Sequence, residues 1–234
     1  MKSHDPLRGS KAKHSRIIDK PRHHRLSVTR VLIIGNARPE NLTKWSEILE
    51  QSDLIIACDG ALGNCIKHQI VVDYLIGDMD SVDQAMLDYA RLNNIEIVKI
   101  PDQQNNDLTK AIQFARNLSA QSIDIIGIDG GRPEHQFANY MSLFEHSENT
   151  RMHLDDSIVI AINKNQSLHH SIEIGTSFSV FSIGESKAVN LAGGKWSLNS
   201  VDLDSSSTGL HNIAVETEIT LSCASGKLLI FIDR

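Results

Sequence analysis

The sequence has few cysteines and no long apolar segment, which argues against a disulfide-rich protein and against a membrane protein. The three cysteines, Cys58, Cys65 and Cys223, form no Cys-x-x-Cys pair, so we expect reduced, partly buried thiols in a cytoplasmic protein. No apolar run approaches the roughly 20 residues that cross a bilayer, which argues against a membrane protein. The Gly-x-x-x-x-Gly-Lys-Ser/Thr motif is also missing, which excludes an ordinary phosphate-loop kinase.

Positive charge is scarce outside the first 25 residues. This segment carries eight Lys or Arg residues and two aspartates, a charge of +6, which leaves −12 on the rest of a chain whose net charge is −6. A body this acidic does not attract nucleic acid, and residues 1–25 lack the apolar core of a secretory signal. We expect residues 1–26 to be a basic, disordered arm, with a transit peptide or a start codon placed too far upstream as alternatives.

The first half of the body alternates short apolar runs with helical stretches. This alternation over residues 27–150 predicts an α/β domain with a parallel sheet covered on both faces. Ser81 is expected to cap one helix, with Gln84 three residues on, and Asp107 to cap another. The expected strands lie within residues 30–36, 53–60, 71–78, 94–100 and 122–130.

The second half has a different pattern of apolar residues. From residue 151 to 234 the helical period disappears and short alternating runs are separated by Gly, Asn and Ser, which predicts an all-β sandwich domain. The fold class is therefore an α/β parallel-sheet domain followed by an all-β sandwich, and one continuous mixed domain is the alternative. The expected strands lie within residues 157–162, 171–174, 177–183, 187–193, 213–222 and 227–232.

Aspartates follow the predicted strands of the first half. The stretch "YLIGDMDS" places Asp78 and Asp80 directly after a buried run, where two like charges repel each other unless a cation lies between them. A single aspartate at a strand end is ordinarily a turn or cap residue, but the carboxyl ends of parallel strands meet at one edge, where such sheets bind ligands. Hard oxygen ligands without nearby Cys or His favour Mg²⁺. The other acids in this pattern are Asp59, Asp102, Asp107 and Asp129.

Two basic residues accompany these acids. Lys110 lies one turn inside the helix that starts at Asp107, and Arg132 follows Gly130 and Gly131. The two glycines allow the backbone to approach a phosphate, and an arginine can grip a phosphate through two hydrogen bonds. A Gly-Gly-Arg turn is often only a loop, so this signal needs support from the rest of the chain.

Four stretches of the first half, taken together, are specific to one family. "CDGA", "IGDMDS", "PDQQNNDLTKA" and "GGRPEHQFAN", in this order, resemble thiamin pyrophosphokinases, and "LAGGKWSL" followed by "SSSTGLHN" resembles the thiamin-binding β-domain of that family. The resemblance covers nearly the whole chain from Arg30 onward. It implies an enzyme that transfers diphosphate from ATP to thiamin, giving thiamin diphosphate and AMP with Mg²⁺. It also implies a homodimer with the thiamin site between two subunits.

The resemblance implies roles for individual residues. Asp78, Asp80 and Asp107 would bind the metal, and these three with Arg132 would be catalytic, with Asp80 or Asp107 as the base. Trp196 would contact thiamin, and Ser207 and Asn212 would lie in its pocket. The implied nucleotide-binding residues are Asp59, Asp102, Thr109, Lys110, Arg132, Glu134, His135 and Asn139.

The chain departs from the family pattern at a few positions. Gln104 and Asn106 replace the usual Asp and Thr, which removes one carboxylate that could bind the metal. Glu134 replaces the usual Asp, which keeps the charge but moves it by one methylene. His211 and Ile213 stand where Ser and Glu are common.

Other interpretations remain open at this stage. The "DMDS" stretch also resembles the nucleophile motif of haloacid-dehalogenase-type phosphatases, although those place it after the first strand and here it follows the third. A non-catalytic thiamin- or nucleotide-binding module is a further alternative. Trp196 could stack on the thiamin cation or belong to the sandwich core.

Overall fold

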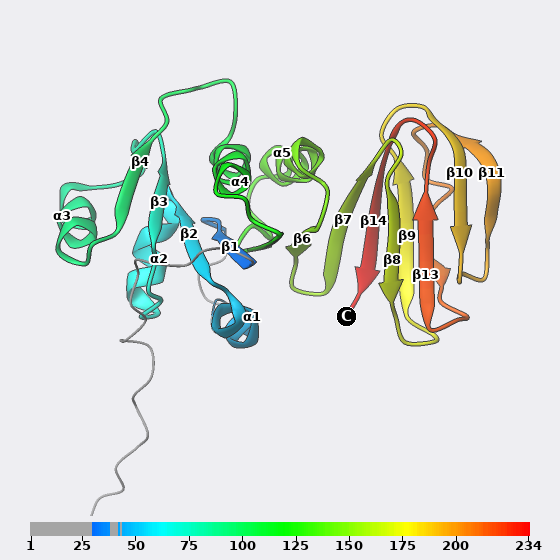
Figure 1. The fold of residues 1–234 in the computed structure, drawn as a ribbon, viewed down its shortest axis with the longest axis horizontal. Helices are drawn as coiled ribbons and strands as arrows, with labels where there is room; N and C mark the ends of the chain where they lie inside the picture. The colour runs from blue at the N-terminus through cyan, green and yellow to red at the C-terminus, as the bar shows by residue number, and fades with distance from the viewer. Residues whose placement is uncertain (1–29, 38–41, 43) are drawn as a thin grey trace, which may run out of the picture.

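The computed structural model describes residues 30–37, 42 and 44–234 (Figure 1). The basic arm expected at residues 1–26 lies outside the described residues. Within the described part of the chain, no helix combines the length and the hydropathy that crossing a bilayer requires. Cys58, Cys65 and Cys223 are all buried and free, as the sequence predicts.

All five strands predicted for the first half are present and parallel. They lie in the order β5-β1-β2-β3-β4, and their apolar runs make the inner residues of the sheet buried on both faces. Because all five run in the same direction, their carboxyl ends share one edge. The bounds are Arg30–Ile34 for β1, Leu54–Cys58 for β2, Tyr74–Gly77 for β3, Glu96–Lys99 for β4 and Ser122–Ile126 for β5.

Helices cover both faces of this part of the sheet. Helices α4 (Asp107–Asn117) and α5 (Pro133–Ser142), followed by the short helix η3 (Leu143–Glu145), pack on one face over alternate residues of β1, β2 and β5. The other face is covered by α1 (Ser46–Gln51), α2 (Leu62–Lys67) and α3 (Gln84–Leu92). In Figure 1, α4 and α5 lie on the upper side of the strands, α1 lies below them and α3 lies to the left of β4. The short helix η2 (Asp59–Ala61) joins β2 to α2.

Two helix caps differ from the sequence prediction. Asp83, not Ser81, caps α3 by accepting a 2.8 Å hydrogen bond from the amide of Met86. The hydroxyl of Ser81 instead donates to Asp80. Asn106, not Asp107, caps α4, because Asn106 is the last residue with an extended backbone and its Oδ1 accepts from the amide of Thr109 at 2.8 Å.

The large sheet does not end at residue 150. Strand β6 (Thr150–His153) adds to β5 in parallel and then pairs with β7 in antiparallel, so one ten-stranded mixed sheet runs through both halves of the chain. The boundary expected after residue 150 therefore falls inside this sheet, and the division into two domains stays a prediction. Beyond β6 the order is β7 (Ser157–Asn163), β14 (Lys227–Asp233), β9 (Ser177–Ser182) and β12 (Asn212–Ile213).

A second sheet packs against this far end of the first. It is antiparallel, and the buried residues of the two layers form one apolar cluster, as in a sandwich. Strand β8 lies a few residues before the expected run 171–174, and β11 was not predicted because its residues are largely exposed and show no apolar alternation. In sheet order the strands are β11 (Leu198–Leu203), β10 (Ser186–Ala192), β13 (Glu218–Ser222) and β8 (Ser167–Ser171).

A cluster of charged and aromatic side chains lies at β5 and β6 of the large sheet. Asp124 and His153 are buried, and His153 Nε2 lies 2.7 Å from the carboxylate of Asp124. The other ring nitrogen of His153 meets the guanidinium of Arg234, which also stacks on the indole of Trp45. These contacts tie the last residue of the chain to the start of α1.

Candidate active site

The acids that follow β2 and β3 come together at the carboxyl edge of the sheet. One carboxylate oxygen from each of Asp59, Asp78 and Asp80 lies within 4.8 Å of the other two. The order of the strands produces this group, because β2 and β3 are neighbours and end at the same level. It is the only group with metal-ligand spacing within the described ranges.

The backbone around the group is shaped to present the carboxylates. Met79, between Asp78 and Asp80, has a left-handed φ of 70°, and its amide donates to Asp59 Oδ2 at 3.2 Å. The amide of Asp80 donates to Asp78 Oδ1 at 3.2 Å, which closes a turn between the pair. Gly77 is required beneath this turn, since a Cβ atom there would lie only 2.7 Å from the side chain of Asp59.

Lys110 is a buried cation beside the group. Its side chain is 4% exposed, and its Nζ lies 2.9 Å from Asp107 Oδ1. Burial lowers the pKa of Lys110, but the hydrogen bond and charge of Asp107, with the charges of Asp78 and Asp102, raise it above its usual value. Lys110 is therefore charged and faces several of the predicted acids. Asp107, expected to bind the metal, is held by this lysine.

The carboxylates repel one another in the absence of a cation. Burial raises the pKa of Asp59, and the charges of Asp107, Asp80 and Asp78 raise it further, against a hydrogen bond from the amide of Gly60. The pKa of Asp78 is lowered, chiefly by the hydrogen bond from the amide of Asp80. A buried carboxylate that resists ionisation, next to two more carboxylates, fits a divalent cation. The oxygens around one Mg²⁺ lie about 3–4 Å apart, which small rotations of these side chains can reach.

Replacing Asp80 with Asn should stabilise the metal-free protein near neutral pH. The raised pKa of Asp59 means that its ionisation costs the folded state free energy, and the charge of Asp80 adds to that cost. This cost is absent below the pKa of the unfolded carboxyl and complete above the raised folded pKa. We expect the melting temperature to rise by about 1–2 °C near neutral pH, and the gain to vanish as the pH falls through the pKa of Asp59.

Thermal melts across pH, without divalent cations, measure this effect. The matched control is Asp88→Asn, which removes an exposed carboxylate of α3 that interacts with Arg91 and Gln84. The control should show no gain that depends on pH in this way. A lower melting temperature for Asp80→Asn, or a gain of equal size at every pH, would contradict the proposed repulsion.

Cys58 lies beneath the acids and does not act as a nucleophile. Burial raises the pKa of its thiol strongly, and the charges of Asp107 and Asp59 raise it further. The thiolate is the reactive form, and it is suppressed here. Cys58 instead belongs to the apolar cluster under α4.

Asp102 and Asp129 occupy different places relative to the group. Asp102 accepts hydrogen bonds from the amide of Gln104 at 2.9 Å and from the side chain of Asn105 at 2.8 Å, which lower its pKa, and its charge acts on Lys110. Asp129 accepts from the amide of Asp155 at 2.9 Å, on the loop after β6. The structure thus brings Asp102 to the edge of the site and directs Asp129 toward the junction with the second half.

Helices α4 and α5 are tied together at the site. Thr109 donates from its hydroxyl to Ser142 at 2.8 Å, and Ser142 donates to Asn106 Oδ1 at 3.1 Å. The side chain of Asn106 also donates to Asn139 at 3.3 Å. Thr109 and Asn139, expected to bind the nucleotide, therefore join the two helices, and Asn106 and Ser142 are partners that sequence reasoning missed.

The turn before α5 presents Arg132 to solvent. Gly130 and Gly131 both have a φ of 82°, a backbone conformation that residues with a side chain adopt only with strain. The space beside Gly131 is open, since no atom lies within 4 Å of a Cβ placed there. The side chain of Arg132 is 78% exposed and pairs with Glu134. His135, in the first turn of α5, is also exposed. Arg132, Glu134 and His135 form an accessible group at a helix N-terminus, where backbone amides favour an anion.

Trp196 lies on the surface of the second half, not in its core. Its side chain is 55% exposed, so the core interpretation is wrong. Asn212 is buried, and its side chain accepts from the amide of Trp196 at 3.1 Å and donates to its carbonyl at 2.8 Å. Asn212, expected to contact thiamin, thus fixes the backbone of Trp196 in the way that a neighbouring strand would.

A cavity of about 360 Å³ opens beside Trp196. Its wall is mostly apolar. The polar lining residues are one carboxylate, three hydroxyls and one amide: Asp204, Ser182, Ser206, Thr208 and Asn212. Ser207, predicted for the pocket, is exposed on the loop between Ser206 and Thr208 but does not line the cavity. The apolar lining residues are Val180, Leu191, Leu198, Leu203 and Leu210.

Comparisons with known proteins agree with these features. The family model "Thiamin pyrophosphokinase, catalytic domain" matches residues 45–154. Thiamin pyrophosphokinase 1 of Caenorhabditis elegans is 27% identical over 149 residues, which cover 58% of this chain and 60% of that protein. Thiamine pyrophosphokinase 1 of Arabidopsis thaliana is 27% identical over 199 residues, which cover 78% of this chain and 73% of that protein.

Solved structures share the fold at low sequence identity. Thiamine pyrophosphokinase from Bacillus subtilis superposes with a TM-score of 0.75 at 18% identity and covers 88% of this chain and 99% of its own. Yeast thiamin pyrophosphokinase gives a TM-score of 0.69 at 17% identity, over 90% of this chain and 88% of its own. The matched catalytic-domain region contains the group of Asp59, Asp78 and Asp80 with Lys110 and Arg132, so the chain is similar to thiamin pyrophosphokinases in the sequence around this site and in its fold.

Proposed function

We propose that the protein transfers diphosphate from ATP to the hydroxyl group of thiamin and releases thiamin diphosphate and AMP. The observation that carries this proposal is the group of Asp59, Asp78 and Asp80 beside the buried cation of Lys110. The similarity of residues 45–154 to the catalytic domain of thiamin pyrophosphokinases supports this choice of substrates and reaction. The hydroxyl oxygen attacks the β-phosphorus of ATP, the bond from that phosphorus to the bridging oxygen breaks, and AMP leaves with this oxygen.

Asp59, Asp78 and Asp80 are the proposed ligands of Mg²⁺. When bound, the ion would neutralise phosphate oxygens and fix their geometry, which is most of what such a transfer needs. Asp59 was expected to bind the nucleotide, and its place in the group extends its proposed role to the metal. Asp107 keeps Lys110 in position, and the attacking hydroxyl passes its proton to a carboxylate of Asp80 or Asp107.

Lys110 and Arg132 are the proposed cations for the phosphate chain. Lys110 is fixed by burial and by Asp107, so it offers a charge in one place. Arg132 is exposed and now pairs with Glu134, so it can turn toward an incoming phosphate. The hydrogen bonds between α4 and α5 hold together the two helices from which these residues project. Asp102 and His135 complete the proposed nucleotide site.

Thiamin is proposed to bind at Trp196, in a cytoplasmic homodimer with the site between subunits. An exposed indole beside a carboxylate suits a cation with aromatic rings. The strand β12 and its neighbours also expose apolar side chains next to Trp196, which supports contact with a second copy. These are Ile174, Leu210, Ile213 and Val215.

The position of the motif in the fold argues against the phosphatase alternative. The Asp78-Met79-Asp80 stretch follows β3, whereas the nucleophile motif of haloacid-dehalogenase-type phosphatases follows their first strand. The non-catalytic alternative would be favoured by loss of the acids, and the acids of the metal group are present with ligand spacing.

A coupled assay tests the proposal. The purified protein with ATP and Mg²⁺ should release AMP only when thiamin is present, and thiamin diphosphate should accumulate in equal amount. The Asp88→Asn variant should behave as the wild type. ADP as the stoichiometric product, or no product in the presence of thiamin, would overturn the proposal.

A further inference from the structure

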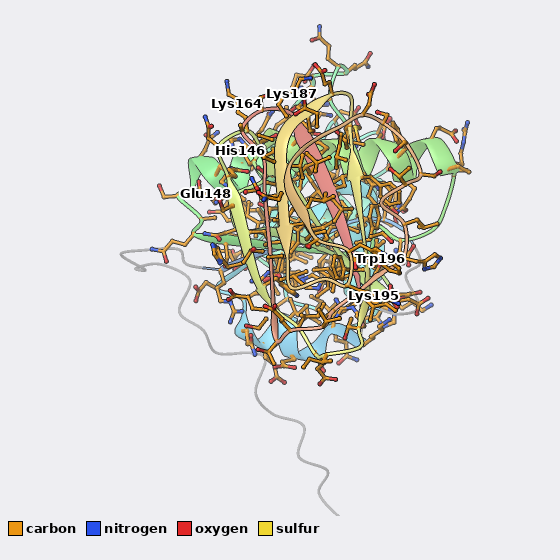
Figure 2. All side chains as sticks on the ribbon, turned by 90° about the vertical axis from the view of Figure 1, so that its right-hand side faces the viewer. His146, Glu148, Lys164, Lys187, Lys195 and Trp196 are labelled. Carbon is orange, nitrogen blue, oxygen red and sulfur yellow. The ribbon has the colours of Figure 1, made fainter. Side chains whose placement is uncertain are left out.

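The ammonium group of Lys195 lies over the indole ring of Trp196. The Nζ atom of Lys195 lies 4.8 Å from the centroid of the Trp196 ring, within the distance of a cation–π interaction. Figure 2 shows the two side chains together near the lower edge of the second half. Both residues are exposed, so a ligand can approach the pair from solvent.

The backbone on both sides of this pair is fixed. The amide of Lys195 donates to the carbonyl of Ile213 at 2.9 Å, and Asn212 holds the amide and carbonyl of Trp196. Gly194 packs closely on Asn212, since a Cβ atom there would lie 2.8 Å from Asn212 Nδ2. Hydrogen bonds and close packing therefore hold the backbone that carries Lys195 and Trp196.

Among the described residues, no carboxylate is within ion-pair distance of the ammonium group of Lys195, whereas Lys187 in the same half pairs with both Glu185 and Asp202. The attraction of Lys195 to the indole is therefore not offset by a competing salt bridge.

We propose that Lys195 weakens the binding of a cationic ring to Trp196 and so sets how far the site prefers cationic over neutral ligands. The ammonium group competes for the ring face that it covers. It also lowers the negative potential that a second cation would meet on the opposite face. A neutral ring of the same shape is not subject to this repulsion. The inference rests on the proposed binding of thiamin at Trp196.

Dissociation constants for two ligands test the inference. Calorimetry compares thiamin with an analogue in which a neutral thiophene ring replaces the thiazolium. Lys195→Met keeps an unbranched apolar side chain but removes the charge. We expect it to bind thiamin about two- to fivefold more tightly and the neutral analogue as the wild type does. Lys195→Arg keeps a cation over the ring and should resemble the wild type for both ligands.

The matched control is Lys164→Met, which makes the same charge change at an exposed lysine far from Trp196 on this face (Figure 2). It should alter neither affinity, which separates a local effect from a change in net charge. Unchanged or weaker thiamin binding by Lys195→Met, or equal tightening of both ligands, would overturn the inference. Wild-type protein that makes no thiamin diphosphate defeats the proposed function, and the inference with it. Wild-type protein that makes it while Lys195→Met leaves the preference unchanged defeats only the inference.

Discussion

Asp78→Asn and Asp80→Asn should each lower the rate of thiamin diphosphate formation by a factor on the order of 10² or more. Each variant replaces a charged oxygen ligand with a neutral amide in a group of only three carboxylates. The phosphates would then be held by an ion with one fewer protein charge to fix it. Steady-state turnover at saturating ATP, thiamin and Mg²⁺ measures the loss.

Both variants should remain folded. Removing one of several neighbouring negative charges relieves repulsion in the metal-free protein, and neither side chain belongs to an apolar cluster. Melting curves of the two variants and of Asp88→Asn establish this point. Near-normal turnover in both variants would show that the metal is held elsewhere.

Trp196→Ala should raise the Michaelis constant for thiamin roughly tenfold and leave that for ATP nearly unchanged. A cation stacked on an indole contributes about 1–2 kcal/mol, and the truncation removes it. Because Trp196 is 55% exposed, the free energy of unfolding should change little. Michaelis constants for both substrates, with a denaturant midpoint, measure the three quantities together.

Trp196→Phe is the matched variant, since it keeps an aromatic face at the same position. It should retain most of the affinity for thiamin, although phenylalanine attracts a cation less than tryptophan does. Equal increases in both Michaelis constants, or a sharply lowered midpoint without a thiamin-selective effect, would contradict a binding role for Trp196.

The strands of the first half and the acids at their ends could be predicted because the signals are local. Each strand is a short apolar run, and each acid directly follows its own strand. The position of acids such as Asp78 at the carboxyl edge of the sheet could therefore be predicted from the sequence. The family resemblance rested on the same local stretches. Strand β11 was harder to predict, because it is exposed along most of its length and shows no apolar alternation.

The sequence placed several acids at one edge of the sheet, but it could not predict which of them lie at metal-ligand distance. Asp59 joins Asp78 and Asp80 because β2 and β3 are neighbours in the sheet and Gly77 lets the side chains approach. Similarly, Ser142 bonds to Thr109 because α5 packs beside α4, a fact of the tertiary fold. The sheet that continues through β6 escaped prediction because a short run after residue 150 gives no sign of its partner.

The destination of the β-phosphorus tests the central claim most directly. With ATP labelled by ³²P at the β-position, thiamin and Mg²⁺, the label should appear in thiamin diphosphate and be absent from the released AMP. Asp78→Asn should suppress this transfer and Asp88→Asn should not. Label retained in ADP, while only a γ-label reaches thiamin, would show that a single phosphoryl group is transferred and would contradict the account.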